Sequence, residues 1–117
     1  MSAEQQREFV KRFYEALDAG DADTASALFP DGTEIHLWDG TTFRTRAEFR
    51  AWFEELYSTS ENASREVTSF SVDGDVADVE VVLRANLGGE DRTVSLRHVF
   101  HFAGDRLVRV EVSIRPL

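Results

Sequence analysis

The chain has 117 residues, of which 42% are hydrophobic, and its formal net charge is −9. This length predicts a single domain over residues 1–117, and the apolar content predicts a folded core rather than a disordered chain. The negative charge disfavours nucleic acids and anionic membrane surfaces as partners, because both select basic protein faces.

The sequence contains no cysteine, which excludes disulfide frameworks, thiolate nucleophiles and zinc sites with cysteine ligands. Residues 1–9 lack the basic and apolar segments of a signal peptide. No apolar run approaches the length needed to span a membrane. We therefore expect a soluble protein located in the cytoplasm.

Three helices are predicted in the first half of the chain. The first opens at a capping box in residues 2–5 and closes at Gly20, since glycine readily adopts the left-handed conformation of a helix end. The second spans residues 21–29, from an aspartate N-cap to the residue before a proline. The third opens at a capping box in residues 45–48 and ends near Ser58, with its apolar residues on one face.

The other segments have the pattern of strands and tight turns. Residues 33–38 and 41–44 flank the dipeptide Asp39-Gly40, which predicts a β-hairpin. From residue 63 onward, four strand-like runs are separated by glycine-containing turns, which predicts a four-stranded meander. Helices collected on one side of a curved antiparallel sheet form an α+β domain, and such a sheet can enclose a pocket.

Alternation along the strands predicts which side chains face the helices. In residues 92–102, His98 shares a face with apolar residues, whereas His101 lies on the opposite face. The inward-facing residues expected on these strands are Val94, Leu96, His98, Phe100 and Phe102, with Val79, Val81, Leu83 and Ala85 and with Val108, Val110, Val112 and Ile114 on the neighbouring strands. His98 is either a core histidine satisfied by one hydrogen bond or a functional residue.

The first helix carries two polar residues, Tyr14 and Asp18, one turn apart at the edge of its apolar stripe. A buried tyrosine hydroxyl needs a partner, and we expect that partner to be His98. Helical geometry alone leaves Asp18 near the surface, at the negative end of the helix dipole. A contact with Arg65 would compensate the carboxylate and the dipole, and would leave guanidinium N–H groups for an anionic ligand.

The first hairpin strand carries a further histidine. His36 and Trp38 share one face of the first hairpin strand, opposite Ile35 and Leu37, and either pair could face inward. No two histidines have metal-ligand spacing with a carboxylate on the same face, so no metal site is expected. The sequence also lacks the G-x-S-x-G nucleophile elbow and a glycine-rich phosphate loop.

The order of elements and the segment FVKRFYEALDAGDADTASALFPDG resemble the NTF2-like or SnoaL-like superfamily across essentially the whole chain. The resemblance implies a cone-shaped α+β fold that encloses a pocket, a fold that hosts isomerases, cyclases, dehydratases and binding modules. Its ketosteroid isomerases need an oxyanion tyrosine and aspartate, and matching places Phe13 and His98 at those positions. Their base falls near His36 or Leu37. Isomerase chemistry of that type is therefore not expected.

A second resemblance, which is near full-length, is to designed luciferases built on idealised NTF2-like scaffolds. It rests on the segments RFYEALDAGDADTA, IHLWDG and REVTSF and on the strand that carries His98. It implies oxidation of a synthetic coelenterazine analogue, diphenylterazine, by molecular oxygen, with light emission and loss of carbon dioxide. In those designs a Tyr–His pair and an Asp–Arg pair frame the substrate, and their counterparts here are Tyr14 with His98 and Asp18 with Arg65.

The same resemblance implies a small-molecule luciferin as ligand, oxygen as co-substrate and no metal or bound cofactor. The residues expected to hold the substrate are Phe13, Leu17, Trp38, Phe53, Val81, Leu83, Leu96, Phe100 and Val110. The alternatives are an isomerase or cyclase acting on a polycyclic ketone, and a non-catalytic small-molecule-binding module. We expect a monomer because the outward strand positions are charged, with a dimer through the outer sheet face as the alternative.

Overall fold

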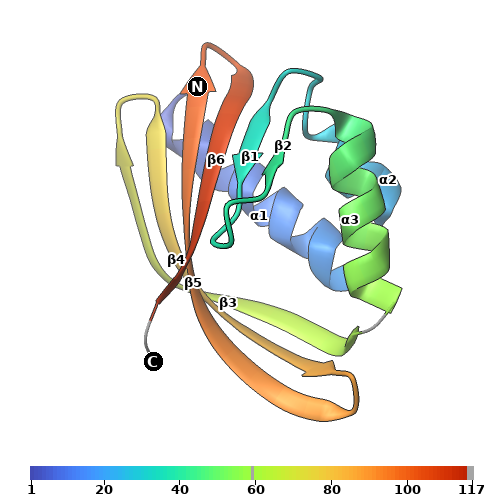
Figure 1. The fold of residues 1–117 in the computed structure, drawn as a ribbon. Coiled ribbons are helices and arrows are strands. Elements are labelled where there is room, and N and C mark those ends of the chain that lie inside the picture. Colours follow the sequence, from blue (N-terminus) through green and yellow to red (C-terminus); the bar gives the residue numbers. More distant parts are fainter. Residues whose placement is uncertain (59, 116–117) are drawn as a thin grey trace.

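The computed structural model of the chain describes residues 1–58 and 60–115 (Figure 1). Within these residues, three helices and six strands follow one another in the predicted order. Their bounds are α1 (Ala3–Ala19), α2 (Ala22–Ala27), β1 (Glu34–His36), β2 (Thr42–Phe43), α3 (Arg46–Ser58), β3 (Ser60–Asp73), β4 (Val76–Leu87), β5 (Glu90–Ala103) and β6 (Arg106–Arg115). None of the described helices is both long and apolar enough to cross a membrane.

The strands form one sheet in the order β2-β1-β6-β5-β4-β3, and the predicted α+β class is confirmed. The meander from β3 to β6 is antiparallel as predicted, but β1 runs parallel to β6. The sequence did not indicate which hairpin strand would join the meander, and the contact is parallel because β1 rather than β2 pairs with β6. Figure 1 shows the long strands curling around α1, with α2 and α3 on the same side of the sheet.

The ends of α1 confirm the capping prediction. Ser2 Oγ accepts from the Gln5 N–H at 3.1 Å, and the Gln5 side chain accepts from the Ser2 N–H at 2.9 Å. Gly20 follows the helix with a φ of 69°, and a Cβ at this position would lie 2.2 Å from a ring atom of Tyr57 on α3. The left-handed backbone therefore favours glycine here, and a Cβ would also have to displace the ring of Tyr57.

Two predicted elements are shorter than expected. Helix α2 ends at Ala27 rather than at residue 29, because the proline that follows disfavours helical backbone in the residue before it. The hairpin strands cover only residues 34–36 and 42–43. The turn between them is longer than the predicted dipeptide, since the Leu37 N–H donates to the Thr41 carbonyl at 2.9 Å.

Alternation along β5 is confirmed, with His98 buried on the face toward the helices and His101 less buried on the other. One prediction on β6 is wrong, because Val108 is exposed and Leu107 is buried in its place. The pairing of β5 with β6 shifts register at Phe102, where a β-bulge inserts an extra residue and changes the alternation.

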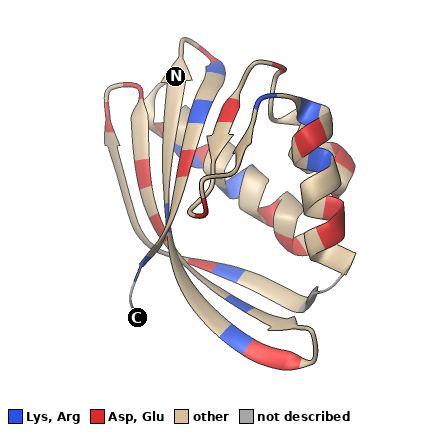
Figure 2. Ribbon diagram, viewed as in Figure 1, with Lys and Arg blue, Asp and Glu red and all other residues tan. Residues whose placement is uncertain are grey.

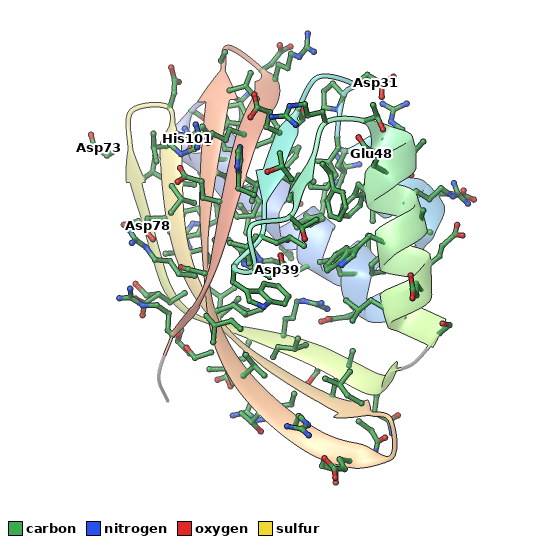
Figure 3. All side chains as sticks on the ribbon, viewed as in Figure 1. Asp31, Asp39, Glu48, Asp73, Asp78 and His101 are labelled. Carbon is green, nitrogen blue, oxygen red and sulfur yellow. The ribbon has the colours of Figure 1, made fainter. Side chains whose placement is uncertain are left out.

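The outer face of the sheet carries charges of both signs, which Figure 2 shows along the meander strands. Arg97 binds Asp78 through two hydrogen bonds of 2.9 and 2.5 Å, and these bonds lower the pKa of the Asp78 carboxyl. A further pair joins Arg84 to Glu66 at 3.1 Å. His101, labelled on β5 in Figure 3, lies 2.6 Å from a carboxylate oxygen on β6.

Candidate functional site

An apolar cavity of about 230 Å³ lies between the concave face of the sheet and the helices. The helices and the segment after α2 contribute a mostly aromatic wall of Phe13, Leu17, Phe29, Phe49, Trp52, Phe53 and Leu56. The strands and the β1–β2 turn contribute Ile35, Leu37, Trp38, Ala63, Leu83, Ala85, Leu87, Val94, Leu96, Val110, Val112 and Ile114. Arg65 and His98 are the polar residues of this wall. Such a site suits a flat, largely apolar ligand that also carries a few polar atoms.

The predicted pair of Tyr14 and His98 forms within the core. Tyr14 Oη lies 2.8 Å from His98 Nδ1, and both side chains are buried. Burial lowers the pKa of His98 to about 3, and the positive charge of Arg65 contributes to the shift. Burial also raises the pKa of the Tyr14 hydroxyl far above its usual range, with Arg65 opposing the shift in part. Both groups are therefore neutral at physiological pH.

The tautomer of His98 decides what the second ring nitrogen can do. If Nε2 carries the proton, the Tyr14 hydroxyl donates to Nδ1, and Nε2–H is left as a donor. If Nδ1 carries the proton, it donates to Tyr14 Oη, and Nε2 keeps a lone pair that can accept a hydrogen bond or a proton. The second arrangement is the one that a general base needs.

Asp18 and Arg65 also meet, which the sequence had left open. The Arg65 guanidinium donates to Asp18 Oδ1 at 2.6 Å, and the Arg65 backbone N–H donates to Oδ2 at 3.1 Å. The Arg65 side chain is 8% exposed and that of Asp18 is 29% exposed. Because the last turn of α1 contains no basic residue, Arg65 also supplies the cation that the negative end of the helix lacks.

Helix α1 therefore carries one member of each pair. Tyr14 and Asp18 project from α1 one turn apart and reach β5 and β3 respectively. The cavity wall includes His98 and Arg65 but neither Tyr14 nor Asp18. The two residues on α1 are thus positioning residues, which fix the cavity-facing groups from behind.

The other end of α1 is fixed by a buried amide. Gln6 Nε2 donates to the carbonyl of Gly74 in the β3–β4 turn at 2.8 Å and to that of Met1 at 3.3 Å. With the contact between Asp18 and Arg65, both ends of the helix are joined to β3 or to its turn. This arrangement sets the position of the Tyr14 hydroxyl relative to the sheet.

Most of the substrate-binding residues expected from the sequence lie in the cavity wall, namely Phe13, Leu17, Trp38, Phe53, Leu83, Leu96 and Val110. Val81 and Phe100 were expected there but do not line the cavity. Both are fully buried in the core, and the ring of Phe100 is covered by those of Phe13 and Tyr14, with centroids 6.1 and 6.4 Å away. Strand alternation predicts which side of the sheet a residue faces, but not where the helix rests on it.

Several wall residues were not singled out as substrate contacts. They include Phe49, Trp52 and Leu56, which lie on the apolar face predicted for the third helix. Their helical spacing was visible in the sequence, but spacing alone does not distinguish a cavity wall from closed core.

The residues of the first hairpin strand differ in which way they face. Ile35 and Leu37 are buried and line the cavity, whereas His36 Nε2 lies 2.9 Å from Glu34 Oε1, outside the wall. Trp38 belongs to the β1–β2 turn and lines the cavity although it is half exposed. Within residues 1–58 and 60–115, no group of three or more His, Cys, Asp or Glu side chains is arranged to hold a metal ion.

Comparison with solved structures shows the fold. The chain is similar to an NTF2-like protein of unknown function from Burkholderia pseudomallei, at 20% identity and a TM-score of 0.85 over 98% of this chain and 92% of that one. It is also similar to a protein with a ketosteroid isomerase-like fold from Catenulispora acidiphila, at 18% identity, a TM-score of 0.82 and coverage of 90% and 83%. A third similar structure is an LEH-like epoxide hydrolase from M. tuberculosis, at 16% identity, a TM-score of 0.79 and coverage of 92% and 80%.

Sequence comparison identifies the family. No curated protein sequence matches the chain. The model of the SnoaL-like domain, in contrast, matches residues 10–110, which include both polar pairs and the greater part of the cavity wall. The chain therefore belongs to the SnoaL-like domain family and has the NTF2-like fold.

Proposed function

We propose that the protein is a luciferase that oxidises diphenylterazine, a synthetic imidazopyrazinone of the coelenterazine type, with molecular oxygen. The products are the corresponding amide, carbon dioxide and light, and the reaction uses no metal or bound cofactor. One observation carries the proposal: the polar groups of an otherwise apolar wall are His98 and Arg65, each backed by a second polar residue. The designed luciferases that the chain resembles carry the same two pairs.

His98 takes the first step as the general base. With Nδ1–H donating to Tyr14 Oη, the Nε2 lone pair accepts the N–H proton of the substrate, and an electron-rich anion forms. The Tyr14 oxygen then stabilises the imidazolium. His98 is neutral in the free protein, with a pKa of about 3, so its lone pair is open at physiological pH. An imidazole with so low a pKa is a weak base, and the proton transfer depends on the negative charge of the substrate anion, which raises the pKa of the adjacent imidazolium.

Oxygen reacts with the anion in the second step. Electrons pass from the substrate to O2, and a C–O bond forms at the carbon beside the carbonyl. The peroxide then closes on that carbonyl as a four-membered ring, which breaks the bond from the carbonyl carbon to its ring nitrogen and leaves the electron pair on the nitrogen. The O–O bond and a C–C bond then break: one oxygen atom leaves in carbon dioxide, and the other becomes the amide carbonyl. The amide anion formed in its excited state emits light, and the proton returns to it from His98.

Arg65 and the apolar wall supply the surroundings that this sequence needs. The guanidinium lies at the wall with little exposure, so its positive charge stabilises the substrate anion and the peroxide more strongly than water would. Asp18 holds the guanidinium in place from the solvent side. The aromatic and aliphatic walls bind the flat substrate by apolar burial and keep water away from the excited product.

The test is to mix the purified protein with diphenylterazine in air-saturated buffer and to count photons. We expect emission from the wild type, and a loss of about 10²- to 10⁴-fold in His98→Ala because the base is removed. Arg65→Ala is expected to lose about 10²- to 10³-fold. His101→Ala, on the other face of the same strand, is the matched control and is expected to retain emission. Undiminished light from His98→Ala would contradict the mechanism.

A second candidate is favoured by the family and by the likeness to a ketosteroid isomerase-like fold. It is an isomerase or cyclase in which the same buried histidine acts on a polycyclic ketone. The remaining alternative is a binding module without catalytic activity. Turnover of such a ketone without emission from diphenylterazine would favour the enzyme. Binding of either compound without turnover would favour the module.

A further inference from the structure

Two apolar residues of the cavity wall are exposed to solvent to an unusual extent. Trp38 and Ile114 are each 50% exposed. Among the large exposed hydrophobic residues in the described part of the chain, these two line the cavity, whereas Tyr57, Val67 and Val108 do not. A wall residue that is half exposed lies where the cavity meets solvent.

The pairing of the strands brings the two residues to the same end of the cavity. Strand β1 runs parallel to β6, with Ile35 opposite Val110 and the next residue of each strand also paired. Trp38 and Ile114 both lie a few residues beyond this paired segment, in the same direction along the chain. Exposure also rises along β6, from 2% at Val110 to 50% at Ile114, so the cavity opens toward this end.

The turn that carries Trp38 is held by its own hydrogen bonds. The Leu37 N–H donates to the Thr41 carbonyl at 2.9 Å, and the Thr41 N–H donates to Asp39 Oδ1 at 2.9 Å. Asp39 is labelled at this turn in Figure 3. These bonds fix the backbone of the turn, so the indole extends from a defined point at the cavity before a ligand arrives, which favours selection of the ligand by shape.

We propose that Trp38 and Ile114 form the mouth of the cavity, and that Trp38 packs on the outermost aryl ring of the bound ligand. A ligand that reaches this mouth covers the exposed half of the indole and gains an aromatic contact. Trp38 thereby selects among luciferins that differ in the aryl group at this end, whereas His98 and Arg65 act on the core of the ligand. The identity of the ligand in this proposal rests on the proposed function.

The absence of cysteine from the sequence allows a direct test. Trp38→Cys, Ile114→Cys and Val108→Cys each introduce a single thiol, whose alkylation by a maleimide is followed under argon with and without diphenylterazine. Val108 is the matched control, because it is exposed on the same strand as Ile114 but does not line the cavity. At a ligand concentration about ten times Kd, alkylation at positions 38 and 114 is expected to slow about tenfold, and alkylation at 108 to stay unchanged.

Emission measured in air separates the two proposals. Light without protection of the thiols at 38 and 114 would overturn the mouth and leave the luciferase standing. Protection at these positions without light would support the mouth and overturn the luciferase. If neither light nor protection is observed, the mouth is overturned. Equal protection at position 108 would also overturn it.

Selectivity is tested with Trp38→Ala. Its KM for diphenylterazine is expected to rise about tenfold, the equivalent of about 1.4 kcal/mol, with kcat little changed. An analogue in which a methyl group replaces the aryl group at the mouth should bind wild type and variant equally. An equal rise in KM for both compounds would overturn the selective role of Trp38.

Discussion

The buried imidazole of His98 predicts how the stability of the protein depends on pH. The pKa of His98 is about 3 in the folded protein and about 6.5 in an unfolded chain. Between these values the unfolded state binds a proton that the folded state does not bind. The contribution of the neutral His98 to the free energy of unfolding is therefore fully present above about pH 6.5, and it is lost as the pH falls toward about 3.

The magnitude follows from the width of this window. Each pH unit within it costs about 1.4 kcal/mol for one proton, so a change from about pH 7.5 to about pH 4.5 costs about 2–3 kcal/mol through His98 alone. Carboxylates also titrate in this range, so the contribution of His98 must be isolated by a variant. His98→Gln does not titrate and retains a polar atom for the Tyr14 hydroxyl.

The assay is denaturant unfolding of both proteins at the two pH values, with the free energy of unfolding extrapolated to water. The wild type is expected to lose about 2–3 kcal/mol more than His98→Gln over this change of pH. Equal losses in the two proteins would show that the imidazole is protonated in the folded state or is accessible to solvent. The reasoning from burial would then be wrong.

Three further outcomes follow from other contacts. Gly20→Ala is expected to cost at least about 2 kcal/mol in unfolding free energy, because it strains a left-handed backbone and meets the ring of Tyr57. A smaller loss in urea unfolding would show that the ring moves away freely. Tyr14→Phe should cost about 1–3 kcal/mol by leaving a buried histidine nitrogen without its partner, and thermal unfolding that matches the wild type would contradict this. Size-exclusion chromatography with light scattering should give a monomer, since ion pairs occupy the outer sheet face, and a dimer mass would contradict that expectation.

Local patterns in the sequence determined the elements and much of the site. The capping boxes and Gly20 set the helix ends because caps act within one turn of the chain. Alternation on one strand was sufficient to place His98 inward, since the side-chain period of a strand is fixed. A buried tyrosine on a helix crossing that strand then made the pair with Tyr14 a natural prediction, and the two side chains do meet.

Contacts between distant segments were decided only by the tertiary structure. Asp18 looked exposed from its helical angle, and it is joined to Arg65 because the curvature of the sheet brings β3 to the end of α1. The bulge that exposes Val108 depends on register between two strands, which no pattern within one strand reveals. Trp38 reaches the mouth of the cavity because β1 pairs with the last strand in parallel, a partner choice made by packing across the whole chain.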